Sequence, residues 1–146
     1  MDAQLEQPFP LRPVTVLASL LAPILMLFHL VGPVPADLGL SNGALRPCTT
    51  TAHCASQTWT STNPTADLNS LLSLVMNSPR TVVVEQNDAY LHAEASSALF
   101  GFVDDLELFA DNDKSQIQAR SESRLGDSDL GVNSRRLATL RSALER

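Results

Sequence analysis

The fold is decided by residues 81–123, which read TVVVEQNDAYLHAEASSALFGFVDDLELFADNDKSQIQARSES. This stretch contains four runs of β-branched or alternating apolar and polar residues, which span 81–86, 89–97, 102–110 and 115–123. Short polar sequences separate these runs, such as Asn87-Asp88 and Asp111–Lys114. Runs of this length and pattern are typical of strands, and short turns join neighbours that run antiparallel. We therefore predict a four-stranded antiparallel meander.

The turn lengths also predict the register, that is, which residues lie opposite one another on adjacent strands. Val84 is expected opposite Leu91, Leu91 opposite Leu108, and Leu108 opposite Ile117. This register collects apolar side chains on a single face of the sheet: Val82, Val84, Leu91, Ala93, Leu106, Leu108, Ile117 and Ala119. Such a face needs a second layer to cover it.

Two amphipathic segments flank the meander and can supply that layer. In the first, Asn63 suits a helix N-cap and Pro64 suits the first turn. Apolar residues then recur with helical spacing until Ser78-Pro79, at Leu68, Leu71, Leu72, Val75 and Met76. In the second, Asn133 is expected to cap a helix with Leu137, Leu140 and Leu144 on one face.

These elements predict an α+β fold, with a four-to-five-stranded antiparallel meander sheet and two helices packed on one face. The fifth strand is the short run at residues 57–62. The chain has 146 residues, which favours one domain. We expect this domain to span 47–146, after a linker at 37–46 and an apolar, helical N-terminal segment within 1–36.

The N-terminal segment carries no formal charge over 18 residues, from Val14 to Val31. This length lies at the lower limit of a transmembrane helix and exceeds a typical signal-peptide core. Pro23 would kink a helix, and Val34-Pro35-Ala36 offers a signal peptidase small residues, with cleavage before Asp37. A membrane anchor, a cleaved signal peptide and a buried segment all stay open. The first two place the domain on the far side of a membrane.

Two cysteines, Cys48 and Cys54, lie in a loop-like stretch with five residues between them. In an oxidising compartment two such cysteines readily pair, so they are a candidate disulfide. A zinc site needs further ligands, and His53 is followed by no CxxC or HxxxH spacing. We expect no bound metal.

The charge distribution argues against nucleic acid as a partner. The net charge is −6, and residues 37–113 hold ten acidic side chains against two basic ones. Phosphate backbones need clustered lysines and arginines. The sequence also has no GxSxG, P-loop, GxGxxG or HExxH motif, so it predicts no cofactor and no standard catalytic centre.

The second face of the predicted sheet gathers ionisable side chains. Glu94 and Asp105 are expected in one row with Arg120, and His92 and Glu107 lie in the next row with Gln118. Cross-strand neighbours lie within about 5 Å, so Arg120 can bridge carboxylates. This cluster of His92, Glu94, Asp105 and Glu107 can raise a carboxyl pKa for acid–base work or hold a hard cation. The alternative is a solvated sheet face with ordinary ion pairs.

Two charged positions require partners. Asp104 is expected on the apolar face beside Ser121, where Arg124 or the amides of the loop 126–131 can pair with it, or where it serves as a ligand-pocket acid. Arg135-Arg136 lies in the first turn of the last helix, against the helix dipole, so Asp127 and Asp129 or a bound anion should compensate. The candidate anion-binding residues are Asp104, Arg120, Arg124, Asn133 and Arg136.

Four blocks of sequence carry a family resemblance. They are Cys48…Cys54-Ala55-Ser56, YLHAE at 90–94, GFVDDLE at 101–107 and RSESRLGDSDLGVN at 120–133. Over about residues 45–146 the chain resembles the domain of unknown function 1499. It departs from that family's pattern at Thr49 and Ala52-His53, where proline and Pro-Asn are common, and at Ser134, where arginine is common. The resemblance implies a bacterial or plastid protein, and with an exported domain it indicates the periplasm or a thylakoid lumen. It supplies no established activity.

Three functions are open from the sequence. The first is a non-catalytic accessory or scaffold domain, membrane-associated or exported, with its polar cluster exposed to solvent and a membrane protein as a possible partner. The second is a domain that binds a small anionic ligand between the loop 124–133 and the sheet. The third is an enzyme that uses the cluster of His92 and three carboxylates.

Overall fold

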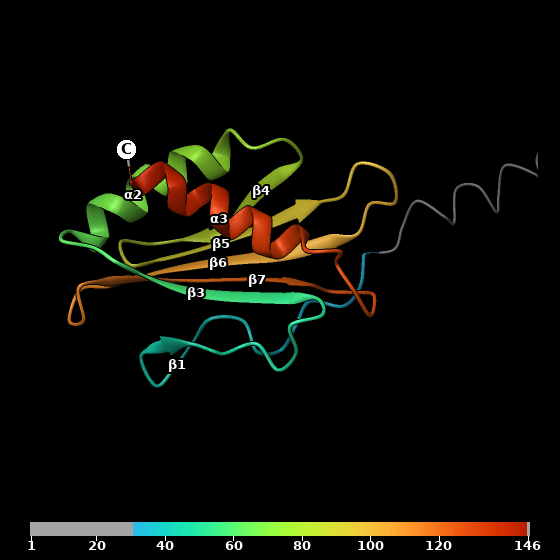
Figure 1. Cartoon of the computed structure of the whole chain (residues 1–146), viewed down its shortest axis with the longest axis horizontal. Helices are drawn as coiled ribbons and strands as arrows, with labels where there is room; N and C mark the ends of the chain where they lie inside the picture. The colour runs from blue at the N-terminus through green and yellow to red at the C-terminus, as the bar shows by residue number, and fades with distance from the viewer. Residues whose placement is uncertain (1–30, 146) are drawn as a thin grey trace, which may run out of the picture.

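The computed structural model describes residues 31–145 and shows a sheet with a different covering on each face (Figure 1). The five strands are β3 (Cys54–Thr60), β4 (Thr81–Gln86), β5 (Tyr90–Ser96), β6 (Val103–Asp111) and β7 (Gln116–Ser123). They lie in the order β3-β7-β6-β5-β4, and every neighbouring pair is antiparallel. Two helices pack on one face. The α+β class is confirmed, with β3 as the fifth strand beside the meander.

The register agrees with the prediction at the central hairpin and slips at the next one. Leu91 lies opposite Leu108, as predicted. Leu108, however, lies opposite Ala119 and not Ile117, a slip of two residues. The turn is displaced because the Asp111 side chain accepts a bond from the backbone N–H of Lys114, at 3.1 Å. Since side chains alternate with a period of two, this slip leaves every residue of β7 on its predicted face.

The first hairpin differs more. Val83 lies opposite Ala93, and a β-bulge follows between Val83 and Glu85. Val83 therefore points toward the helices, whereas Val82 and Val84 are 64% and 54% exposed. The prediction that Val82 and Val84 belong to the core is wrong, because an extra residue in one strand shifts the alternation.

The two helices cover the apolar face that β5, β6 and β7 present. Helix α2 (Pro64–Met76) begins as predicted, with the Asn63 side chain accepting a bond from the N–H of Ala66 at 3.2 Å. Helix α3 (Val132–Leu144) begins earlier than expected, with Gly131 as its N-cap. Asn133 is fully buried and does not cap the helix, which corrects that prediction. The shared core contains Trp59, Leu68, Leu71, Val75, Leu91, Leu106, Leu108, Ile117, Leu137 and Leu140.

The other face is covered by the N-terminal strap, by which we mean residues 37–48. It contains the short hairpin β1 (Leu40–Ser41) and β2 (Ala44–Leu45) and runs beneath the sheet (Figure 1). The strap is bonded to the sheet at the backbone N–H groups of Gly39 and Leu45, which donate to Glu107 and Gln118 at 2.7 and 2.9 Å. A disulfide between Cys48 and Cys54 joins it to the start of β3. Residues expected to form a linker are therefore packed on the sheet.

The apolar segment predicted to anchor or export the chain lies outside the described residues, except for Val31. Among the helices within residues 31–145, none has the length and apolar character to cross a bilayer.

Candidate functional site

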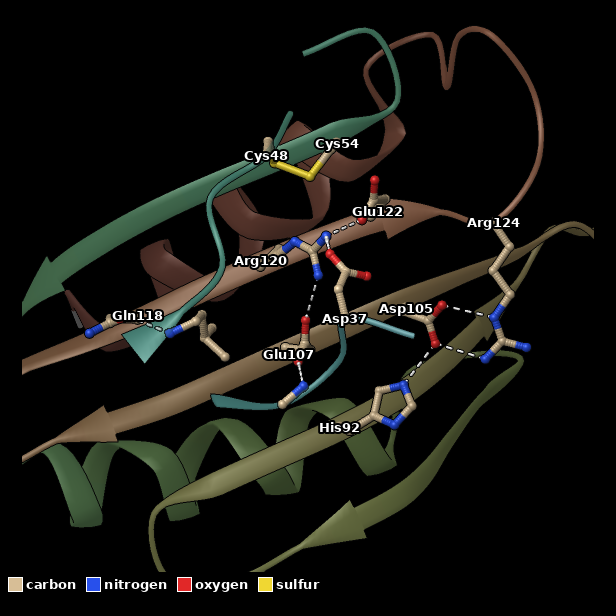
Figure 2. Close-up of polar contacts among 12 residues, drawn as sticks. Asp37, Cys48, Cys54, His92, Asp105, Glu107, Gln118, Arg120, Glu122 and Arg124 are labelled. Carbon is tan, nitrogen blue, oxygen red and sulfur yellow. Dashed lines mark hydrogen bonds and ion pairs between the residues drawn. A yellow bond between two sulfur atoms is a disulfide. The ribbon is translucent and has the colours of Figure 1, made fainter. Parts of the chain in front are cut away.

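The polar face predicted from the sequence is a buried ionic network, not a solvated surface. The relative exposures of His92, Asp105, Glu107 and Arg120 are 5%, 2%, 1% and 2%. Figure 2 shows these side chains on the face of the sheet that the strap crosses, with Asp37 reaching from the strap to Arg120. The expectation of a solvent-exposed cluster is thus wrong for all its members except Glu94, which is half-buried. One reason is that the strap, which packs on Glu107 and Arg120, was predicted to be a linker.

Glu107 and Arg120 form the centre of the network. They lie opposite each other on β6 and β7, with Arg120 Nη1 donating to Glu107 Oε2 at 3.0 Å. The other carboxylate oxygen accepts two bonds of 2.7 Å, from the Tyr90 hydroxyl and the Gly39 N–H. Arg120 Nη2 also bonds to Asp37 in the strap, at 3.0 Å, and to Glu122. This pair therefore ties the strap to three strands of the sheet.

Arg120 keeps one unfavourable feature. Its Nε is buried and has no hydrogen-bond partner among the described side chains and backbone groups. A buried unpaired donor costs about 1–3 kcal/mol, so the three carboxylates around the guanidinium must offset that cost.

A second group lies around Asp105, toward the end of the sheet. Arg124 donates to both Asp105 oxygens, from Nε and Nη2 at 2.8 Å each, and also bonds to Glu94. His92 Nε2 lies 2.7 Å from Asp105 Oδ1. Arg120 was expected in this row, but the two-residue slip of β7 moves it opposite Glu107 and puts Glu122 opposite Asp105. The arginine that bonds to Asp105 is Arg124, which follows the end of β7. The predicted cluster of His92, Glu94, Asp105 and Glu107 is therefore brought together, with different arginines beside its members.

The environment shifts several pKa values away from those useful for proton transfer at neutral pH. Burial alone would raise the pKa of Asp105, but the hydrogen bonds from Arg124 and His92 outweigh it and hold that pKa below its ordinary value. The Asp105 carboxylate in turn holds the pKa of Arg124 above its ordinary value. Burial, followed by the hydrogen bond to Glu107, raises the pKa of the Tyr90 hydroxyl. The charged carboxylate, the charged guanidinium and the neutral phenol are thus the stable forms.

A separate cluster lies on the helix side of the sheet. Asp104 is buried there and bonds to Arg136 Nη2 at 2.7 Å and to the Ser123 hydroxyl at 2.6 Å. Arg136 Nη1 also reaches Ser121 and Asn133, at 2.7 Å each. Asp104 is thus paired through Arg136 and Ser123, and not through Arg124 or the loop amides, which corrects the predicted partners. Arg136 is compensated by Asp104.

Asp129 was predicted to compensate the charge of Arg135-Arg136, but in the structure it bonds to the backbone at the start of α3. Its carboxylate accepts bonds from the N–H groups of Gly131 and Asn133, at 2.8 Å each, at the start of α3. Burial opposes this charge, but the backbone bonds outweigh it and lower the Asp129 pKa. Arg135 donates to the carbonyl of Leu130 at 2.9 Å. The start of α3 is therefore stabilised by Asp129, and each arginine there has a partner within the chain.

The five candidate anion-binding residues do not form one site. Arg120 and Arg124 lie on the strap side of the sheet, whereas Asp104, Asn133 and Arg136 lie on the helix side. Within the described part of the chain, no three His, Cys, Asp or Glu side chains are arranged to hold a metal ion.

Three members of the network were not singled out from the sequence: Asp37, Tyr90 and Glu122. The alternation of β5 and β7 places Tyr90 beside His92 and Glu122 beside Arg120 on one face, so this signal was present. Asp37 gave no such signal, because it lies 83 residues from Arg120 in a stretch without periodicity.

The chain belongs to the family described as "Protein of unknown function (DUF1499)", whose model matches residues 37–144. This confirms the resemblance and extends it to Asp37, so that the strap is part of the matched region. Neither the curated proteins nor the solved structures contain a match to the chain.

Proposed function

We propose that this chain is a non-catalytic accessory or scaffold domain that works at a membrane surface. The solvent-exposed cluster expected of such a domain is not found, and the support comes instead from the use made of the ionisable residues. Asp105, Glu107, Arg120 and Arg124 have buried side chains that neutralise one another in pairs. Glu107 and Arg120 also hold the strap on the sheet, through Gly39 and Asp37. A catalytic acid or base has to exchange protons with a substrate, and these side chains are bonded to one another instead.

The proposal includes a location outside the cytoplasm, in the periplasm or a thylakoid lumen. The disulfide between Cys48 and Cys54 favours an oxidising compartment. The apolar run from Val14 to Val31 would attach the chain to the membrane or direct its export. The partners we expect are the lipid bilayer and a membrane protein.

Fractionation of the native cells followed by mass spectrometry of the intact chain tests this function. We expect the chain in the membrane fraction after a high-salt wash, with Cys48 and Cys54 oxidised. Recovery in the cytoplasm with both thiols reduced would contradict the proposal. The mass also reports whether the chain begins at Met1 or at Asp37, which separates an anchor from a cleaved signal.

A second candidate function, binding of a small anion, has one observation in its favour. A cleft of about 340 Å³ is lined by two arginines, Arg80 and Arg136, together with Thr81, Ser96 and Ser97. Asp104 lines the same cleft and pairs with Arg136, so much of the positive charge is already neutralised. Inorganic phosphate and citrate should raise the melting temperature if the cleft is an anion site. An Arg80→Gln variant should lose that increase, and an unchanged melting temperature in the wild-type chain would eliminate this function.

A further inference from the structure

The two connections at one end of the sheet expose large apolar side chains. Leu99 and Phe100 lie between β5 and β6, and Leu130 and Val132 lie at the junction of the β7–α3 connection with α3. Their relative exposures are 68%, 48%, 83% and 41%. We call these four residues the loop-end patch. Single exposed apolar residues are common on protein surfaces, but a contiguous group indicates a surface that contacts something apolar.

The loop-end patch is contiguous. Leu99, Phe100, Leu130 and Val132 all line one hollow of about 490 Å³, together with Phe102 and Leu125. The rings of Phe100 and Phe102 are neighbours, with centroids 5.8 Å apart. The two connections therefore form one apolar surface.

Leu130 adds a further sign that this surface is not there for the stability of the domain. Its φ angle is 52°, in the left-handed region that favours glycine and disfavours a branched side chain. The side chain is the most exposed of the four, so burial does not offset this strain.

The chain enters the domain at this same end. Gly32 packs so closely on Arg124 and Leu125 that an added Cβ would lie 2.8 Å from Arg124 Cβ and Leu125 Cγ. Leu125 also lines the apolar hollow. Figure 1 shows the first described residues at the end where the β5–β6 and β7–α3 connections lie. The apolar run ends at Val31, immediately before Gly32, so no spacer separates it from the domain.

We propose that the loop-end patch lies in the interface of the lipid bilayer, with Leu99, Phe100 and Leu130 inserted between the lipid headgroups. This inference rests on the proposed membrane attachment and adds an orientation and a second contact to it. A bilayer-spanning segment that ends at Val31 brings Gly32 to the membrane surface, since consecutive Cα atoms are about 3.8 Å apart. The apolar end of the domain then faces the lipid.

The charges at this end indicate which lipids suffice. Arg124 is neutralised by Asp105 and Glu94. The exposed charges near Leu130 are of both signs, Asp127 and Arg135, the latter bonded to the Leu130 carbonyl. Because this is one arginine and not a cluster of basic side chains, attraction to anionic lipid contributes little. We therefore expect the patch to contact phosphatidylcholine bilayers and to do so with little dependence on salt.

The test uses the full-length chain in phosphatidylcholine vesicles, with a nitrobenzoxadiazole label on Leu99→Cys or Leu130→Cys. The native cysteines are joined in the disulfide and do not react. The matched control is Asp113→Cys, in the β6–β7 turn at the opposite end of β6. We expect lipids that carry a doxyl quencher to reduce the label's fluorescence at least twofold more at 99 and 130 than at 113.

The outcomes separate the inference from the function on which it rests. If the chain does not float with the vesicles at all, membrane attachment is wrong and the inference fails with it. If it floats but the labels at 99 and 130 are quenched no more than the label at 113, only the inference is overturned. It is also overturned if those labels are shielded from aqueous iodide yet unquenched by lipid, because a second copy of the chain or its own residues 14–31 would then cover the patch.

Discussion

Arg120 is a buried cation surrounded by three carboxylates, two from β6 and β7 and one from the strap. Taking such charges out of water is costly, and their mutual attraction offsets this cost only while the partners stay together. Removal of one partner therefore leaves buried charges without compensation.

The change Arg120→Met should lower the free energy of unfolding by about 3–5 kcal/mol. Glu107, Glu122 and Asp37 would then face one another without a cation. The matched control is Arg141→Met, which breaks an exposed pair with Glu145 worth under about 1 kcal/mol. Urea unfolding measures both, and equal losses would show that the buried network does not stabilise the domain.

From two side chains of the network we predict how the stability of the fold falls at low and at high pH. The pKa of Asp105 is lower in the folded chain than its ordinary value of 3.8. Ionised Asp105 therefore stabilises the fold fully at pH values above 3.8, and this stabilisation is lost as the pH falls through the folded-state pKa. The pKa of the Tyr90 hydroxyl is higher in the folded chain than its ordinary value of 10.0. The neutral phenol therefore stabilises the fold fully at pH values below 10.0, and this stabilisation is lost as the pH rises through the folded-state pKa. Melting temperatures should therefore be highest between these values.

The variants Asp105→Asn and Tyr90→Phe should each reduce the slope of stability against pH on one side only, and Asp129, whose pKa is also lowered, should keep part of the acid slope. Asp105→Asn should flatten the acid limb, and Tyr90→Phe should flatten the alkaline limb. Melting curves at closely spaced pH values measure the slopes. An acid limb that Asp105→Asn leaves unchanged would mean that other carboxylates determine it.

The strap is the element that distinguishes this sheet from an open two-layer fold. Its near end is held by the pairing of Asp37 with Arg120 and the bond from Gly39 to Glu107, and its far end by the disulfide to Cys54. Its hairpin is short, so side-chain and covalent contacts hold it more than strand pairing does.

Replacing Cys48 and Cys54 together by serine should lower the free energy of unfolding by about 2 kcal/mol. The strap should also open more often, because its only covalent attachment to β3 besides the chain itself is lost. Amide hydrogen exchange should accelerate at Gly39 and Leu45, whose N–H groups bond to the sheet, and much less at Leu108 in the core. Equal acceleration at all three would indicate global destabilisation without selective opening of the strap.

The elements also show what could be predicted from the sequence and why. Alternation located β5, β6 and β7, and the Asn63-Pro64 signal located the start of α2, because these patterns are local. The slip of β7 left its residues on the predicted faces, since it was a slip of two residues and side chains alternate with a period of two. The bulge in β4 could not be recognised from the local sequence, and it moves Val82 and Val84 from the predicted core face to the exposed face. The strap was missed because its contacts join residues such as Gly39 and Glu107, which are 68 positions apart.

At the scale of the whole molecule, the two ends of the sheet differ in character. One end of the sheet carries the polar β4–β5 and β6–β7 turns, in which Asn87 and Asp111 accept bonds from the backbone of their own turns. The opposite end, with the β5–β6 and β7–α3 connections, carries the loop-end patch and the point at Gly32 where the chain enters the domain. An end that is apolar without being needed for the core is a candidate for function, not for stability.

The change Leu130→Gly tests this distinction. It removes an exposed side chain and the strain of a left-handed φ, so stability should stay unchanged or rise by up to about 1 kcal/mol. The control Leu137→Ala, in the buried face of α3, should cost about 2–5 kcal/mol. Thermal unfolding compares the two, and a loss of more than about 1 kcal/mol for Leu130→Gly would show that this leucine serves the fold.

The attachment of the strap has a consequence for the order in which the chain folds. Asp37 and Gly39 bind to Arg120 and Glu107, so the strap cannot dock until the β6–β7 hairpin exists. The disulfide closes a loop with a sequence separation of only 6, which needs no sheet. In a chain that emerges N-terminus first, oxidation can therefore come early, whereas docking of the strap must wait until β7 has emerged. The strap is thus made long before the part of the sheet that holds it in place.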